Sequence, residues 1–206
     1  MDDESMDDRE FIDDRIAALK ESGKYFGNKN KPERERWVCI EFLTNLRIPF
    51  ADADIQSPAI DPPDVVFADA RFEIKEILDP GRKRHDEYKQ QLAHAERATA
   101  PQDLLTLFTP KDITPAEVCQ RVLDALRELG DRYLADERSG IDLLFYVNLK
   151  HHTLTAGLLP EFPHLREFNW RSINVLMGWS SFVLFAAEDA PSFLLENSAK
   201  VVQREF

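Results

Sequence analysis

The sequence is poor in cysteine and has no long hydrophobic run. Its two cysteines, Cys39 and Cys119, lie far apart in segments that we expect to be helical, which predicts buried thiols in a reducing compartment. No run of about eighteen apolar residues occurs, so we expect no membrane span. The first residues are acidic, the reverse of a secretory or mitochondrial leader. Together these features predict a cytoplasmic protein.

Several common catalytic motifs are also missing. There is no glycine-rich phosphate loop, and Gly178-Trp179-Ser180-Ser181 lacks the second glycine of a nucleophile elbow. The histidines His151, His152 and His164 lack metal-ligand spacing with cysteines or further histidines. These absences leave the acidic residues as the main candidates for chemistry.

Basic residues are scarce, since 26 Lys and Arg stand against 38 Asp and Glu and the net charge is -12. Residues 1–14 hold eight acids and one base, so this segment carries -7 and the rest of the chain -5. Affinity for a nucleic-acid backbone comes from Lys and Arg, so the lack of a broad basic stripe counts against tight duplex binding. Clustered acids do suit a metal site, where bound cations offset their charge.

The length of 206 residues and the hydrophobic content of 43% predict one domain with a sizeable core. Helices are expected at residues 9–22, 32–47, 82–99 and 115–136, and from Pro191 onward. Strands are expected at residues 48–56, 64–68, 71–78, 103–109, 141–149, 172–178 and 182–187. This order predicts a mixed α/β fold with a central sheet flanked by helices.

The expected single domain spans residues 1–206 and has three parts. Residues 1–30 form an acidic N-terminal extension, residues 31–150 form the core, and residues 151–206 add a C-terminal hairpin and a helix. No internal repeat is present.

One pair of adjacent strands carries the pattern on which the predicted function depends. Side chains alternate across a strand, so Glu73 and Lys75 share one face. Phe72 and Ile74 take the other, apolar face. Asp64 begins the partner strand, and a hairpin brings its carboxylate beside Glu73. Two carboxylates can hold Mg²⁺ or Mn²⁺, with the backbone carbonyl of Ile74 as a further ligand, while Lys75 orients a water or stabilises developing charge.

The acid-x-Lys triplet is not specific by itself. Two copies occur, Glu73-Ile74-Lys75 and Glu87-Tyr88-Lys89, about as many as chance gives at this composition. The second lies in an expected helix, where this spacing does not put both groups on one face. The first lies in a strand, nine residues after Pro63-Asp64, and this context supplies the signal.

With Pro63-Asp64 followed by Glu73-Ile74-Lys75, the sequence resembles the PD-(D/E)XK nuclease superfamily. The restriction-endonuclease-like αβββαβ core of that superfamily resembles the expected element order over residues 33–149. The resemblance implies metal ligation by Asp64 and Glu73 and a catalytic role for Lys75. The chain also resembles a small bacterial family labelled "putative endonuclease".

Many superfamily members carry one more acid on the helix before the sheet. Here Glu33, Glu35 and Glu41 compete, and Glu35 falls on the apolar face of the helix. An acid on a sheet-facing stripe is costly unless it binds something, so we choose Glu35 as the further metal ligand. Its alternative role is that of an exposed first-turn residue favoured by the helix dipole.

The leading hypothesis is an endonuclease that hydrolyses phosphodiester bonds of DNA with Mg²⁺ or Mn²⁺. Arg82, Lys83 and Arg84 follow the hairpin and could contact phosphates, although such a run is often a solvated helix start. Many nucleases of this class dimerise to cut both strands, so a homodimer is possible. Two alternatives stay open: an inactive nuclease-like module that binds a protein partner, and a metal hydrolase for small phosphorylated substrates.

Overall fold

The computed structural model describes residues 7–25, 28–130, 132–162 and 164–204. The chain divides into two compact units. The helical unit comprises Met1–Lys31 and Pro80–Thr109, and the sheet unit comprises Pro32–Asp79 and Pro110–Phe206. Residues 1–6, which hold part of the expected acidic extension, lie outside the described residues.

The helical unit contains α1 (Asp8–Tyr25), η1 (Asn28–Asn30), α3 (Arg84–Ala95) and η3 (Pro101–Leu104). Helices α1 and α3 pack against each other, and α1 buries Ile12 and Leu19. The expected helices at residues 9–22 and 82–99 are therefore confirmed, with shifted ends. None of the described helices is long and apolar enough to cross a membrane.

The prediction of a strand at residues 103–109 is wrong. The Asp103 carboxylate accepts two backbone N–H hydrogen bonds at the start of η3, and this cap turns the chain instead of extending it. The apolar side chains that follow are open to solvent, with Leu105 74% and Leu107 98% exposed. An apolar run forms a strand only where its backbone groups bond to a partner strand. None of the described strands pairs with residues 103–109.

The sheet unit is built on a seven-stranded sheet of order β1-β2-β3-β5-β7-β8-β9. Its strands are β1 (Ile55–Gln56), β2 (Val65–Phe67), β3 (Ala70–Leu78), β5 (Asp142–Asn148), β7 (Ser172–Met177), β8 (Ser180–Ala186) and β9 (Lys200–Gln203). Strands β3, β5 and β7 are parallel, and the other neighbours are antiparallel. The predicted mixed α/β fold with a central mixed sheet is confirmed.

The remaining elements of this unit are helices and a two-stranded parallel sheet. They are α2 (Lys31–Asn45), η2 (Asp52–Asp54), β4 (Lys111–Ile113), α4 (Pro115–Leu129), α5 (Ala135–Arg138), β6 (His152–Leu154), η4 (Leu165–Phe168) and α6 (Ser192–Glu196). Strands β4, β6 and β9 were not predicted. They are three or four residues long, which is too short for a clear periodicity.

Two other expected elements are shorter than predicted. Of the strand expected at residues 48–56 only β1 forms, because Asp54 accepts the Ala51 N–H at 2.7 Å and closes η2. The helix expected at 115–136 ends at Leu129, and α5 follows as a separate turn of helix. The β7–β8 hairpin and the helix after Pro191 are confirmed.

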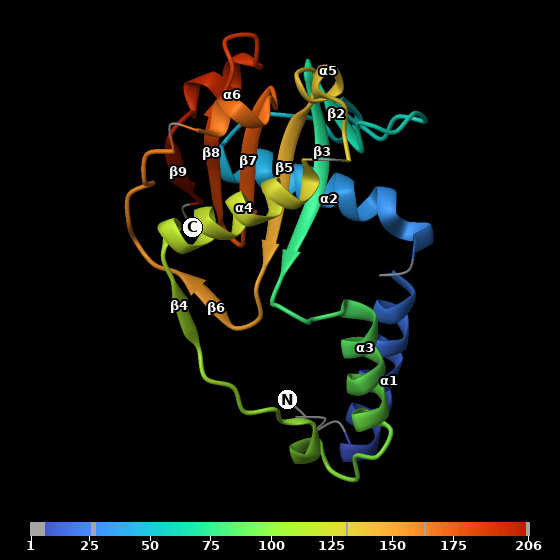
Figure 1. Ribbon diagram of the computed structural model, residues 1–206. Helices are drawn as coiled ribbons and strands as arrows, with labels where there is room; N and C mark the ends of the chain where they lie inside the picture. The colour runs from blue at the N-terminus through green and yellow to red at the C-terminus, as the bar shows by residue number, and fades with distance from the viewer. Residues whose placement is uncertain (1–6, 26–27, 131, 163, 205–206) are drawn as a thin grey trace. The chain divides into compact units, whose positions relative to one another are not determined.

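The two faces of the sheet are covered by different helices (Figure 1). Helix α2 packs Val38, Phe42 and Leu43 against Phe72 on one face. Helix α4 packs its apolar stripe on the other face, where Ile77 also lies. Because side chains alternate along β3, Glu73 and Lys75 share the α4 face with Ile77.

The expected burial of both cysteines is also confirmed. Cys39 on α2 and Cys119 on α4 are free thiols with at most 1% exposure. Burial raises the pKa of each thiol to about 12, and for Cys39 it outweighs the opposing effect of Arg36.

Candidate metal centre

The β2–β3 hairpin brings Asp64 beside Glu73. Val65 pairs with Phe72 in the antiparallel ladder, so Asp64, one residue earlier, lies opposite Glu73, one residue later. The Oδ2 atom of Asp64 accepts a hydrogen bond from the Ile74 backbone N–H at 2.9 Å. The two carboxylates predicted to lie together therefore do so.

Glu73 is almost completely buried, at 2% exposure. Its Oε1 atom accepts hydrogen bonds from the Lys75 ammonium at 2.5 Å and the Tyr133 hydroxyl at 2.6 Å. Its Oε2 atom is buried and has no hydrogen-bond partner among the described residues. A buried carboxylate oxygen without a partner is costly, and a bound cation would remove that cost.

Lys75 and Tyr133 hold defined protonation states around Glu73. Burial lowers the pKa of Lys75, but hydrogen bonds to Glu73 and Tyr133 and the Glu73 charge raise the pKa by more, so the net pKa lies above its usual value. Burial and the hydrogen bond to Glu73 raise the pKa of Tyr133. At neutral pH, Lys75 is thus an ammonium cation and Tyr133 a neutral hydrogen-bond donor.

Tyr133 belongs to the site although the sequence did not point to it. It lies between α4 and α5, its ring packs edge-on against Trp170 with centroids 5.2 Å apart, and the Lys75 ammonium lies 5.5 Å from its ring centroid. No spacing rule links a residue in this loop to β3, so only the fold could reveal it.

A third carboxylate joins the pair, and it is Asp61. One oxygen atom of each of Asp61, Asp64 and Glu73 lies within 4.8 Å of the other two. Asp61 is exposed, whereas Asp64 and Glu73 are buried, so the group has one side open to solvent. Three carboxylates at this spacing supply the hard oxygen ligands that Mg²⁺ and Mn²⁺ prefer.

The acids on α2 lie outside this group of described carboxylates. Glu35 is 8% exposed and thus buried, as its place on the apolar stripe predicts. However, α2 packs on the Phe72 face of the sheet, and Glu73 points to the opposite face. Glu33 is exposed, and Glu41 forms an ion pair with Arg204 at 2.8 Å. A metal-ligand role for Glu35 stays a prediction.

The backbone of Ile74 carries the predicted further metal ligand, its carbonyl oxygen. In an extended strand the N–H and C=O groups of one residue point the same way, and the Ile74 N–H points to Asp64. We therefore expect the carbonyl to face the same side, which keeps it available as the predicted further ligand.

The predicted phosphate-binding run belongs to the helical unit. Arg82 forms an ion pair with Glu87 at 2.8 Å, and both side chains are 18% exposed. Lys83 is the exposed N-cap residue of α3, and Arg84 begins the helix half-buried. Of the three, Lys83 has the most exposed side chain, and phosphate contacts by this run stay a prediction.

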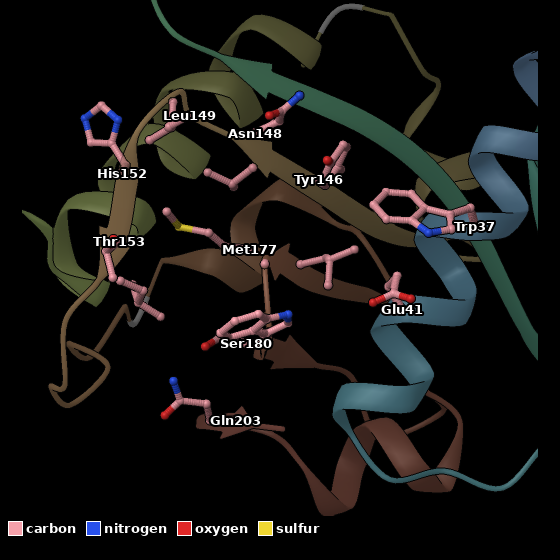
Figure 2. Close-up of a pocket in the computed structure, with 15 residues that line it drawn as sticks. Trp37, Glu41, Tyr146, Asn148, Leu149, His152, Thr153, Met177, Ser180 and Gln203 are labelled. Atoms are coloured by element: carbon pink, nitrogen blue, oxygen red, sulfur yellow. The ribbon is translucent and has the colours of Figure 1, made fainter. Parts of the chain in front are cut away.

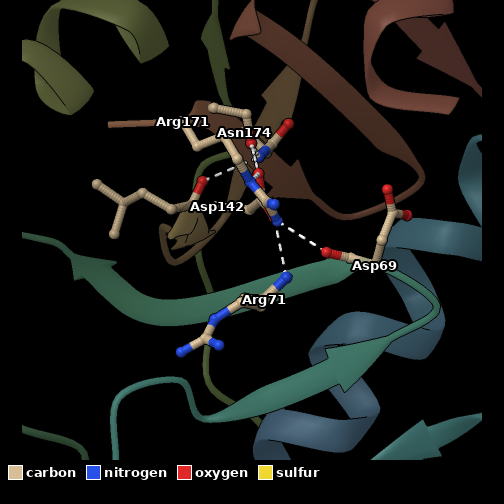
Figure 3. A network of polar contacts seen from close by, with 7 residues as sticks. Asp69, Arg71, Asp142, Arg171 and Asn174 are labelled. Carbon is tan, nitrogen blue, oxygen red and sulfur yellow. Dashed lines mark hydrogen bonds and ion pairs between the residues drawn. The ribbon is translucent and has the colours of Figure 1, made fainter. Parts of the chain in front are cut away.

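A buried network fastens the hairpin to the neighbouring strands (Figure 3). Asp142, at 0% exposure, accepts hydrogen bonds from the Arg71 backbone N–H at 2.9 Å, from the Ser172 hydroxyl at 2.8 Å and from the Arg171 guanidinium. The same guanidinium donates to the Asp69 carbonyl at 2.9 Å, in the turn between β2 and β3. Strands β3, β5 and β7 are thereby joined at the end of the hairpin that precedes Glu73.

The chain is similar to a protein of known structure. That protein, from Pseudomonas aeruginosa strain PAO1, is described as a protein of unknown function of a monooxygenase superfamily, and its sequence is 27% identical to this chain. The match covers 97% of each chain with a TM-score of 0.67. The search of curated proteins finds no match. Residues 7–206 match the family described as "Putative endonuclease, protein of unknown function (DUF1780)", so the chain belongs to that family and the predicted resemblance to an endonuclease family is confirmed.

Proposed function

We propose that this chain is a metal-dependent nuclease of the PD-(D/E)XK type that hydrolyses phosphodiester bonds of DNA. One observation carries the proposal: the β2–β3 hairpin gathers Asp61, Asp64 and Glu73 within 4.8 Å, with Lys75 bound to the same Glu73. The endonuclease description of the family supports it.

The order of elements supports the same assignment. Helix α2 is followed by β1, β2 and β3 as an antiparallel meander, and then α4 leads to β5, which runs parallel to β3. This is an αβββαβ order with α3 and the short strand β4 inserted between β3 and α4, and the short helix α5 between α4 and β5. The acid-x-Lys triplet lies on the third strand of that order.

The residues present fit a divalent metal ion. The Glu73 Oε2 atom is buried without a hydrogen-bond partner, and Asp61 keeps the group accessible from solvent. Asp61, Asp64 and Glu73 would hold the ion, with the Ile74 carbonyl as a further oxygen ligand. A bound Mg²⁺ or Mn²⁺ would supply an activated water and neutralise charge on the phosphate.

The chain's own groups have separate tasks in hydrolysis. Water oxygen forms the new bond to phosphorus, the ester P–O bond breaks, one proton leaves the water and one is taken up by the leaving oxygen. Lys75, held as an ammonium, stabilises the negative charge that develops on the phosphate. Tyr133 holds the Glu73 Oε1 atom by a hydrogen bond, so the Oε2 atom would be the one to bind a metal ion.

Cleavage assays on single-stranded and double-stranded DNA with Mg²⁺ or Mn²⁺ test the proposal. Asp64→Asn and Glu73→Gln should abolish cleavage, and Lys75→Met should lower kcat by about 10²- to 10³-fold. Asp69→Asn is the matched control, because Asp69 is an exposed carboxylate in the turn of the same hairpin. Equal cleavage by wild type and Asp64→Asn would overturn the proposal.

The net charge of -12 favours a second candidate, an inactive module that binds a protein partner. Calorimetry separates the two. The nuclease should bind Mn²⁺ with an affinity that Glu73→Gln weakens strongly, whereas no binding at millimolar Mn²⁺ would support the inactive module. Hydrolysis of free nucleotides but not of DNA would instead assign the centre to small phosphorylated substrates.

A further inference from the structure

A cavity lies at the carboxyl ends of the parallel strands β5 and β7 in the sheet unit. Its volume is about 420 Å³, which is within the range of small-molecule sites. Its lining includes Trp37 and Glu41 from α2, His152 from β6 and Gln203 from β9 (Figure 2). In open α/β sheets, ligands bind in the crevice beyond the carboxyl ends of the strands.

The two tryptophans of this cavity are exposed. Trp37 is 43% and Trp179 59% exposed, whereas Trp170, which does not line the cavity, is 2% exposed. Tyr146 meets Trp37 edge-on with ring centroids 5.5 Å apart. Exposed aromatic side chains that gather around one cavity indicate a surface made to be covered by a ligand.

The backbone that presents Trp179 is held firmly. Gly178 and Trp179 form the two-residue turn between the paired residues Met177 and Ser180, and Gly178 has φ +54°, which glycine adopts without strain. The Gly178 carbonyl accepts a hydrogen bond from the fully buried Asn45 side chain at 3.1 Å. The Trp179 carbonyl accepts one from the Arg204 backbone N–H at 2.9 Å.

This anchoring fixes the position of the Trp179 backbone before a ligand arrives. A rigid aromatic platform loses little conformational freedom on binding, so more of the stacking free energy appears as affinity. Arg204 also donates to the Asn45 Oδ1 atom at 3.0 Å and to Glu41 at 2.8 Å, so one network supports both sides of the cavity.

The polar lining suits a neutral ligand with hydrogen-bonding edges. Gln203 contributes an amide, and Ser180 and Thr153 contribute hydroxyls. The Asn148 amide also lines the cavity but donates to Glu76 at 2.9 Å. No Lys or Arg is among the described residues that line the cavity. A phosphate would therefore meet no strong cation there, whereas amides and hydroxyls match the donors and acceptors on the edge of a base.

We propose that this cavity binds one unpaired nucleobase, stacked on Trp37 or Trp179 and hydrogen-bonded at its edge by Gln203 and Thr153. The inference deepens the proposed nuclease function, on which its biological role rests, by naming single-stranded nucleic acid as the substrate class. Aromatic stacking with edge hydrogen bonds is how unpaired bases are recognised, since a base inside a duplex is not accessible to such a cavity.

The cavity and the carboxylate hairpin are separate places on the sheet unit. Glu73 pairs with Leu143 on β5, and Tyr146 and Asn148 lie three and five residues further along that strand, an offset of roughly 10 to 16 Å at about 3.3 Å per residue. Glu73 faces α4, whereas Tyr146 packs on the face that α2 covers. The cavity is therefore a contact apart from the carboxylates and not part of the cleavage site.

Intrinsic tryptophan fluorescence can test this binding directly. The wild-type protein is titrated with adenosine, guanosine, cytidine and thymidine, without divalent metal, and with ribose 5-phosphate as the ligand that lacks a base. We expect saturable quenching by at least one nucleoside and none by ribose 5-phosphate. At least one of Trp37→Ala and Trp179→Ala should weaken binding by about fivefold or more, as measured by calorimetry.

Two further variants guard against misfolding and non-specific effects. Phe108→Ala is the matched control, because Phe108 is an aromatic residue of the helical unit with 58% exposure, close to that of Trp179. Gln203→Ala removes an exposed hydrogen-bonding group, does not disturb the core, and should weaken nucleoside binding. Circular dichroism should show that each variant is folded.

Three results would overturn the proposal: no saturable quenching by any nucleoside, equal binding by folded wild-type and both tryptophan variants, or equal quenching by ribose 5-phosphate. Failure of this proposal is distinct from failure of the nuclease proposal. Glu73→Gln should bind nucleosides as the wild type does while it loses cleavage. Cleavage without nucleoside binding would reject only the base cavity, and nucleoside binding without cleavage would reject only the nuclease chemistry.

Discussion

The two candidate sites of the sheet unit are built in opposite ways. The carboxylate hairpin places Asp61, Asp64 and Glu73 on one short stretch of chain and depends on buried charge. The cavity brings Trp37 and Trp179 together from α2 and the β7–β8 turn and depends on exposed apolar faces. The charged site therefore takes its carboxylates from one hairpin, whereas the aromatic site takes its side chains from elements that are distant in the sequence.

The largest effect should follow from breaking the network behind the hairpin. Asp142→Asn should lower the free energy of unfolding by about 3–5 kcal/mol, because it leaves the Arg171 guanidinium, 12% exposed, without its charged partner. Urea denaturation measures this change. Asp69→Asn, in the exposed turn, should stay within about 0.5 kcal/mol of wild type. Equal stability of Asp142→Asn and wild type would show that the network does not anchor the hairpin.

Asn45→Ala should weaken the frame of the aromatic cavity and leave the carboxylate site intact. It removes the hydrogen bonds to Gly178 and Arg204, at a cost of about 1–3 kcal/mol in the free energy of unfolding. Nucleoside affinity should fall, while Mn²⁺ affinity measured by calorimetry should match wild type. A parallel loss of both affinities would mean that the two sites are not independent.

Tyr133→Phe should change the carboxylate site by a smaller amount. Loss of the hydroxyl hydrogen bond to Glu73 removes about 1 kcal/mol, so kcat should fall by about fivefold. Steady-state kinetics should show the loss in kcat with little change in KM, because Tyr133 acts through Glu73. Nucleoside binding should not change, and an unaltered kcat would remove Tyr133 from the site.

The smallest change in stability is expected at Glu117, whose carboxylate already accepts hydrogen bonds. Glu117 accepts hydrogen bonds from the Thr114 N–H and hydroxyl, both at 2.8 Å, and these lower its pKa. A lowered folded-state pKa stabilises the protein above the usual glutamate pKa, and this contribution is lost as pH falls through the folded-state value. Glu117→Gln should therefore be less stable than wild type at neutral pH, and the gap should close in acid. Thermal melts across that range measure it, and a gap that persists unchanged in acid would contradict the assignment.

The sequence could predict the hairpin because its determinants are local. Strand alternation places Glu73 and Lys75 on one face, and the short connection brings Asp64 opposite, so no distant element is needed. Helix α2 shows what a sequence pattern does not predict. Its apolar stripe correctly predicts that Glu35 is buried, but periodicity does not say which face of the sheet the helix covers.

The sequence analysis missed Asp61, which lies only three residues before Asp64. The other groups that it missed depend on tertiary structure. Tyr133 and Asp142 reach β3 from more than fifty residues away in the chain. The aromatic cavity depends on a helix and a turn that meet only in the folded unit. The strand expected at residues 103–109 failed for the same reason, because an apolar run alone does not show whether a partner strand exists.

The alternation along β3 also has a consequence for folding fidelity. A one-residue slip of the strand would turn Glu73 and Lys75 into the apolar layer beneath α2 and move Phe72 to the carboxylate side. The Arg71 N–H donates its hydrogen bond to Asp142 only in the native alignment of β3. The network therefore stabilises the correct pairing of the strands. A chain with this misalignment would therefore lose both its packed core and its carboxylate site. Such a chain would be open to proteolysis and would not persist as a stable inactive form.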